Sequence, residues 1–149
     1  MHIRLVSVLL AALLAGPALA APAQQASRVL TGADLFNIEA ASDPQISPDG
    51  KTVVYVRRSN DIMTDRARSS LWTIDVASGA QMPLVAGAGS YSQPRWSPDG
   101  SRIAYLSNAE DKSGTQLFVR WMKTGASARI TSLPATPFGI TWSPDGHRI

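Results

Sequence analysis

Few residues in this chain could act in catalysis, and their spacing fits none of the common catalytic sets. There is no cysteine, and the two histidines are His2 and His147. A Ser–His–Asp set needs a histidine that a carboxylate orients toward the nucleophile. Residues 89–93 read Gly-Ser-Tyr-Ser-Gln and lack the final glycine of a G-x-S-x-G turn, and neither a P-loop nor an H-E-x-x-H pattern occurs. We therefore assign no catalytic residue, no metal ligand and no cofactor to this chain.

The acidic residues are spaced in a way that indicates turns and solvated loops. One set occupies the third position of a recurring Ser-Pro-Asp-Gly tetrapeptide, and its members are Asp49, Asp99 and Asp145. Because the three copies fall in different repeats, we interpret these aspartates as turn residues far apart in space. A second group, Asn108, Glu110 and Asp111, is interpreted as a solvated loop. A calcium site there is the alternative, but it lacks the regular alternation of oxygen ligands.

Four arginines make one segment the weak candidate for substrate binding. Residues 57–68 form a polar stretch that carries Arg57, Arg58, Arg66 and Arg68. We expect a long loop here, and loops on rigid scaffolds often carry function. The arginines could pair with acidic groups of a substrate or of a neighbouring domain. The alternative is a solvated loop that is partly paired with itself.

The elements that position these residues follow from an internal repeat. Ser-Pro-Asp-Gly occurs at 47–50, 97–100 and 143–146, at spacings of 50 and 46 residues. Proline fixes φ at the first central position, and glycine tolerates a positive φ, so each copy predicts a tight turn between two strands. The residue before each copy is Ile46, Trp96 or Trp142, and we expect these tryptophans to be core residues between repeats.

Each repeat predicts four strands, which is typical of a β-propeller blade. The expected strands are 43–47, 52–58, 70–76 and 81–85, then 93–97, 102–107, 116–122 and 127–131. The predicted fold is therefore an all-β propeller fragment, with blades at 43–91 and 92–137 and a partial blade at 138–149. A β-sandwich is the alternative. Residues 21–42 are expected to form a leader with a short helix at 34–41, because Thr31 and Asp34 fit a capping pattern.

The N-terminus has the layout of a secretory signal peptide. Arg4 precedes an apolar run at 5–15, and residues 18–20 read Ala-Leu-Ala. Cleavage after Ala20 predicts an exported protein, periplasmic or extracellular, with no membrane span afterwards. The formal charge of +3, with no basic run, gives no reason to expect a nucleic-acid partner.

Several of these segments resemble a known family. Residues 31–36 (Thr-Gly-Ala-Asp-Leu-Phe), 42–51 (Ser-Asp-Pro-Gln-Ile-Ser-Pro-Asp-Gly-Lys) and 116–121 (Gln-Leu-Phe-Val-Arg-Trp) resemble the start of the propeller in the prolyl oligopeptidase family of serine peptidases. The closest likeness is to acylaminoacyl-peptidase-like and dipeptidyl-peptidase-like members. The resemblance implies a propeller that gates access of peptides to a C-terminal α/β-hydrolase domain, so that the Ser, Asp and His of the triad would lie beyond Ile149.

Two further expectations accompany this resemblance. The chain stops within the second strand of the third repeat, so we expect the natural protein to continue and the isolated piece to be poorly stable. The competing class is a non-catalytic periplasmic TolB-like propeller that binds protein partners. We favour the peptidase because little sequence separates the signal peptide from the first blade, whereas TolB-like proteins resemble one another in having a separate domain there.

Overall fold

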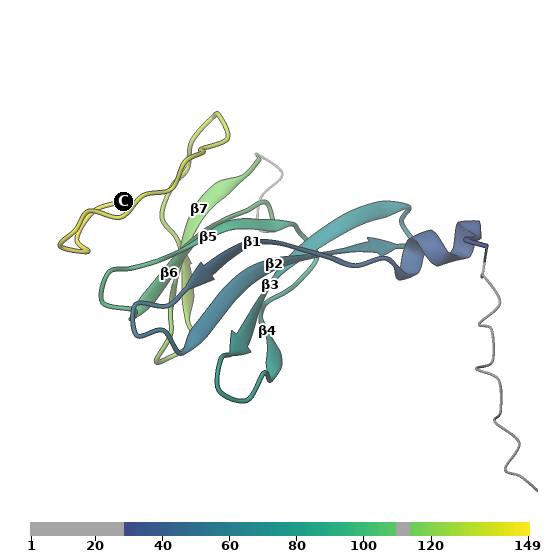
Figure 1. The fold of residues 1–149 in the computed structure, drawn as a ribbon. Helices are drawn as coiled ribbons and strands as arrows, with labels where there is room; N and C mark the ends of the chain where they lie inside the picture. The colour runs from purple at the N-terminus through teal and green to yellow at the C-terminus, as the bar shows by residue number, and fades with distance from the viewer. Residues whose placement is uncertain (1–28, 110–113) are drawn as a thin grey trace, which may run out of the picture.

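The strands form two successive antiparallel sheets. The computed structural model describes residues 29–109 and 114–149, so the predicted signal peptide and the acidic residues Glu110 and Asp111 lie outside the described residues. The elements in chain order are η1 (Gly32–Asn37), β1 (Ala40–Ile46), β2 (Thr52–Asp61), β3 (Arg66–Asp75), β4 (Gln81–Val85), β5 (Tyr91–Trp96), β6 (Arg102–Ser107), β7 (Gln116–Trp121) and β8 (Ser127–Arg129). Their order is β1-β2-β3-β4 in one four-stranded sheet and β5-β6-β7-β8 in the other (Figure 1). The predicted all-β class and the two four-stranded blades are confirmed.

The Ser-Pro-Asp-Gly segments form the predicted turns through one repeated set of bonds. In the first copy, the Ser47 hydroxyl donates to Asp49 Oδ1 at 2.6 Å and accepts from the Thr52 N–H at 2.9 Å. The Ser47 N–H closes the turn on the Thr52 carbonyl at 2.7 Å. The φ of Gly50 is +72°, a conformation that glycine adopts without steric cost. The same bonds recur at 97–102 and 143–148.

The expected loop at 57–68 is wrong in most of its length. Strands β2 and β3 pair without interruption from Thr52↔Asp75 to Asp61↔Arg66, which leaves residues 62–65 as the connection. The result is a long hairpin that projects from the first sheet beside η1 (Figure 1). Its polar sequence suggested a loop because the hairpin end has no fully buried side chain and needs no apolar residues. Backbone pairing alone continues the ladder there.

The lead-in is shorter than predicted and is a 3₁₀ helix. The capping pattern is present, since both the N–H and the hydroxyl of Thr31 donate to Asp34, at 2.8 and 2.7 Å. The helix spans Gly32–Asn37, whereas Ala40 and Ala41 already pair with Arg58 and Arg57 in β1. The cross-strand pairing therefore takes residues that the sequence pattern had given to the helix.

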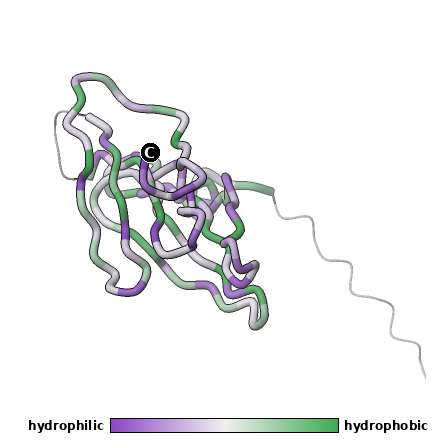
Figure 2. The backbone as a smooth tube through the Cα atoms, turned by 90° about the vertical axis from the view of Figure 1, so that its left-hand side faces the viewer, coloured by the Kyte–Doolittle hydropathy of each residue, from purple (hydrophilic) through white to green (hydrophobic). Residues whose placement is uncertain are grey.

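The core lies between the two sheets and on the far face of the second. One buried cluster joins Val54, Val56 and Leu71 of the first sheet to residues of the second, including Ile103 and Phe118. Burial of each of these aliphatic side chains stabilises the folded state by about 1.5–3 kcal/mol relative to an exposed side chain. Figure 2 shows hydrophobic and hydrophilic stretches that follow one another along the backbone.

The third repeat covers the second sheet. Residues 138–149 include the turn but no strand, and Ile140 and Trp142 pack against a second cluster that contains Leu106 and Val119. The second sheet is therefore apolar on both faces, as stacked blades require. Trp96 and Trp142 pack against these two clusters, as predicted for core residues between repeats.

Polar bonds between successive repeats follow the same spacing as the turns. The Trp96 indole N–H donates to the Gln45 carbonyl at 3.2 Å, and the Trp142 indole N–H donates to the Arg95 carbonyl at 3.0 Å. Gln45 and Arg95 occupy the same position in their repeats, directly before Ile46 and Trp96. An ion pair of 2.9 Å between Arg95 Nη1 and Asp43 Oδ2 also joins the first strands of the two sheets.

Candidate functional site

The sheet order divides the chain reversals between two opposite rims. In an antiparallel meander, every second reversal lies on the same side. The three Ser-Pro-Asp-Gly turns therefore share one side, here named the turn rim. The β2–β3 hairpin end, the 86–90 connection and residues 108–109 after β6 share the other side, here named the hairpin rim.

The aspartates of the turn rim serve the turns. Serine hydroxyl and backbone donors hold the pKa of each carboxyl below its usual range, and the donors come first from Ser47 for Asp49 and from Ser143 for Asp145. For Asp99, the first cause of the lowered pKa is the Ser101 hydroxyl, at 2.6 Å, and the second is the Ser97 hydroxyl. These groups stay ionised at neutral pH and cannot act as general acids. Within 29–109 and 114–149, no three acidic or histidine side chains gather closely enough to hold a metal.

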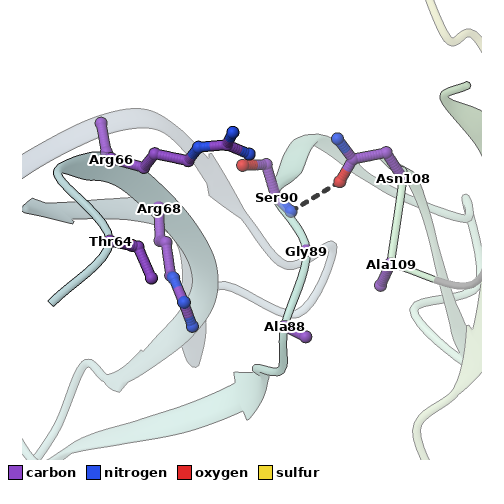
Figure 3. A pocket seen from close by; sticks show the side chains of 9 residues that line it. Thr64, Arg66, Arg68, Ala88, Gly89, Ser90, Asn108 and Ala109 are labelled. Carbon is purple, nitrogen blue, oxygen red and sulfur yellow. Dashed lines mark hydrogen bonds between the residues drawn. The ribbon is translucent and has the colours of Figure 1, made fainter. Parts of the chain in front are cut away.

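The hairpin rim contains a pocket of about 470 Å³ between the two sheets (Figure 3). The β2–β3 hairpin forms one wall, and the 86–90 connection and the end of β6 form the other. The lining residues are Thr64, Arg66, Ala67, Arg68, Ala88, Gly89, Ser90, Asn108 and Ala109. Two of the four predicted arginines are thus brought together in one cavity.

The other two predicted arginines lie elsewhere. Arg57 pairs with Glu39 and lies over the Trp72 ring at 4.3 Å, and the bond to Glu39 raises the pKa of Arg57. It is therefore occupied within the first sheet. Arg58 lines a smaller neighbouring hollow of about 320 Å³, together with Ser42 and the base of the hairpin. No carboxylate partner for Arg58 is found among the described residues.

The hairpin wall of the pocket is held by Asp61. Asp61 Oδ1 accepts the Met63 N–H at 2.9 Å, and Asp61 Oδ2 lies 2.8 Å from Arg68 Nη2. The pKa of Asp61 is lowered, first by the Met63 N–H and then by the Thr64 hydroxyl and the charge of Arg68. One carboxylate thus fixes both the hairpin end and the position of Arg68.

The opposite wall comes from Ser90, which the sequence did not point to as a binding group, and from Asn108, which it placed in a solvated loop with a calcium site as the alternative. The Ser90 N–H donates to Asn108 Oδ1 at 2.8 Å, which joins the 86–90 connection to the end of β6 (Figure 3). Gly89 lies so close that a Cβ at this position would be 2.5 Å from the Ala109 Cα. Ser90 and Asn108 stand 18 residues apart, and only the meander order places both on one rim.

This pocket has the volume to hold a small molecule, but its described residues do not form a Ser–His catalytic set. Among the described residues, the histidine is His147, which lies two residues after Asp145 in the third turn on the opposite rim. Ser90 therefore has no histidine near it in the described structure. The arrangement can supply positive charge and hydrogen-bond donors to a ligand.

The curated relatives of the chain are named as peptidases. The chain is 31% identical over 122 residues to the uncharacterized peptidase YuxL of Bacillus subtilis, a match that covers 82% of this chain and 18% of the relative. It is 30% identical over 154 aligned positions to dipeptidyl-peptidase 5 of Porphyromonas endodontalis, which covers 97% of this chain and 22% of the relative. The chain thus spans about a fifth of the length of these relatives. No model of a protein family matches it.

Solved structures with the same fold are propellers. The β-propeller domain of the trilobed protease of Pyrococcus furiosus matches with a TM-score of 0.59 at 22% identity, over 72% of this chain and 32% of that one. The acylaminoacyl peptidase of Pyrococcus horikoshii matches with a TM-score of 0.60 at 22% identity, over 76% and 17% of the two chains. TolB of Acinetobacter baumannii matches with a TM-score of 0.54 at 22% identity, over 72% and 25%.

Together these likenesses confirm the predicted resemblance. The relatives' names support a chain related to peptidases, and the solved structures establish the propeller fold and exclude the β-sandwich alternative. The chain has the fold of part of a β-propeller, and it resembles the propellers of the trilobed protease and of acylaminoacyl peptidase.

Proposed function

We propose that this chain is the substrate-gating propeller of an exported serine peptidase that cleaves peptides, with its catalytic α/β-hydrolase domain beyond Ile149. The observation that carries the proposal is the 31% identity to a named peptidase over 82% of the chain. The same match covers 18% of that relative, which leaves ample length for a catalytic domain outside the propeller. The absence of a catalytic set within the described residues fits this division of labour.

The propeller's part in the reaction is to select and hold the peptide. Its strands stack into a rigid support, and the hairpin-rim pocket presents arginine and amide donors on a face free of the Ser-Pro-Asp-Gly turns. A peptide backbone offers carbonyl acceptors, and peptide ends and acidic side chains offer carboxylates, so this lining suits a peptide. The nucleophile, the base and the oxyanion donors would come from the other domain.

Export is the second component of the proposal. It rests on the apolar run at 5–15 and the Ala-Leu-Ala at 18–20. In the part of the chain that the structure describes, no helix has the length and apolarity to cross a membrane. Cell fractionation followed by N-terminal sequencing tests this component, and a mature protein that begins at Ala21 is the expected result. A cytoplasmic protein that retains Met1 or His2 would refute it.

A TolB-like binding propeller is the second candidate, because the TolB structure shares the fold at a TM-score of 0.54. Labelling of the full-length protein with a fluorophosphonate probe separates the two. A serine peptidase becomes labelled at one serine, and mapping by mass spectrometry should place that serine outside residues 1–149. In a serine peptidase, this labelling should also abolish the hydrolysis of dipeptidyl and acyl-aminoacyl chromogenic substrates. A protein that neither becomes labelled nor cleaves any peptide is a binding propeller.

A further inference from the structure

The pocket on the hairpin rim carries an excess of positive charge and of hydrogen-bond donors. Arg66 and Arg68 line it, and none of its described lining residues is acidic. The remaining polar groups are the hydroxyls of Thr64 and Ser90 and the amide of Asn108. Its volume of about 470 Å³ lies within the ~300–1,000 Å³ of pockets that hold small ligands. A lining of this kind is suited to an anionic group.

The two arginines differ in how far their charge is already balanced. Arg68 Nη2 lies 2.8 Å from Asp61 Oδ2, so the hairpin itself compensates this guanidinium. Arg66 has no carboxylate partner among the described residues, and its side chain extends from the hairpin toward Ser90 (Figure 3). Among the described lining residues, the unbalanced charge is therefore the single positive charge of Arg66.

The wall opposite the hairpin adds neutral donors. Asn108 accepts the Ser90 N–H through its amide oxygen, at 2.8 Å. That bond orients the amide and leaves its nitrogen as the group that can donate to a bound molecule. The Ser90 hydroxyl is a further polar group of the same lining. An ionised carboxyl group accepts hydrogen bonds only, and arginine binds it through two parallel bonds.

We propose that this pocket binds the carboxylate of a peptide, with Arg66 as its charged partner and the Asn108 amide as an additional donor. The proposal rests on the proposed function for the identity of the ligand as a peptide. A carboxylate is favoured over a phosphate because one unbalanced positive charge matches one negative charge, whereas a phosphate group carries about −1.5 to −2 at neutral pH. The carboxylate can belong to an acidic side chain or to the C-terminus of the peptide.

Calorimetric titration of the full-length protein with four blocked peptides tests the proposal. The first is acetyl-Ala₄-Glu-amide, the second is its glutamine counterpart, the third is acetyl-Ala₅ with a free C-terminus, and the fourth is acetyl-Ala₅-amide. We expect at least one acid to bind about tenfold more tightly than its neutral counterpart, the effect of one charge-assisted bond. The acid that shows this preference identifies the source of the carboxylate.

Three variants assign the preference to the pocket. Arg66→Gln should reduce it to less than about twofold, whereas Arg66→Lys should retain part of it, because lysine keeps the charge but not the paired donors. Arg148→Gln is the matched control, since Arg148 is an exposed arginine beside the third turn, on the opposite rim. This control should keep the full preference. Unchanged circular dichroism spectra and melting temperatures show that the variants fold.

The outcomes separate this proposal from the proposed function. Equal binding of acidic and neutral peptides, or a preference that survives Arg66→Gln, overturns the carboxylate site. Binding of inorganic phosphate without any peptide preference also overturns it. If the acid preference depends on Arg66 but no hydrolysis is detected by mass spectrometry, the pocket stands and the peptidase assignment fails.

Discussion

Replacement of the turn serines by alanine should destabilise the protein in proportion to their burial. Ser97 is fully buried, with 0% of its surface exposed, and Ser47 is 7% exposed, whereas Ser143 is more open to solvent. The Ser97 hydroxyl accepts the Arg102 N–H at 2.9 Å and donates to Asp99 at 2.6 Å. In Ser97→Ala, this backbone N–H loses its side-chain partner in a place that water does not reach.

The magnitude follows from that loss. A buried donor left without a partner costs about 1–3 kcal/mol, so we expect Ser97→Ala to lower the free energy of unfolding by about 2 kcal/mol. Ser143→Ala removes the same bonds, but water can replace them, so its cost should be below about 1 kcal/mol. Ser47→Ala should fall between the two. The matched series changes one atom at equivalent positions of one motif.

Urea unfolding of the full-length protein and its three variants provides the measurement, with tryptophan fluorescence as the signal of the propeller. Hydrogen exchange at the amides of Arg102 and Arg148 localises the effect. Equal destabilisation by Ser97→Ala and Ser143→Ala would refute the reasoning, because burial would then not decide the cost of the lost bond.

Three other perturbations have defined outcomes. The pKa values of Asp49, Asp99 and Asp145 are lowered in the folded protein, so their contribution to stability is present above the unfolded-state pKa of about 3.9 and is lost as pH falls below it. The melting temperature should therefore fall between pH 5 and pH 2. A melting temperature that does not change over this range would contradict the reasoning. Trp96→Phe removes the bond to the Gln45 carbonyl and should cost about 1–2 kcal/mol, measured by urea unfolding, and a neutral effect would contradict the bond. Gly89→Val should separate the pocket walls, because even a Cβ at this position would lie 2.5 Å from the Ala109 Cα. The variant should bind peptides more weakly in calorimetry while its sheets stay folded. An unchanged affinity would contradict the geometry.

The turns made most of the fold predictable from the sequence. Ser-Pro-Asp-Gly fixes a local structure through its own side chains, so the strands on either side of it lie within a few residues of their predicted positions. The loop prediction at 57–68 was wrong because no local side-chain signal of this kind exists there. Residues such as Ser59 and Asn60 have no apolar pattern, and they are strand only because β3 supplies a full ladder of partners.

The pocket was predictable only in part. Arg66 and Arg68 stood out because of their charge, but nothing in the local sequence distinguishes them from Arg57, which is paired with Glu39. Ser90 and Asn108 carry no motif, and they meet through the order of the strands. To predict this contact, one must know on which rim each connection lies. That follows from the sheet topology and not from the local sequence.

The direction of the indole bonds has a consequence for how the chain folds as it is made. In both described cases the donor lies in the later repeat and the acceptor carbonyl in the earlier one. The ribosome releases the earlier repeat first, so each new repeat finds its acceptor already held in a completed strand. Synthesis and assembly can therefore proceed in the same direction, because the acceptor of each indole bond is made before its donor.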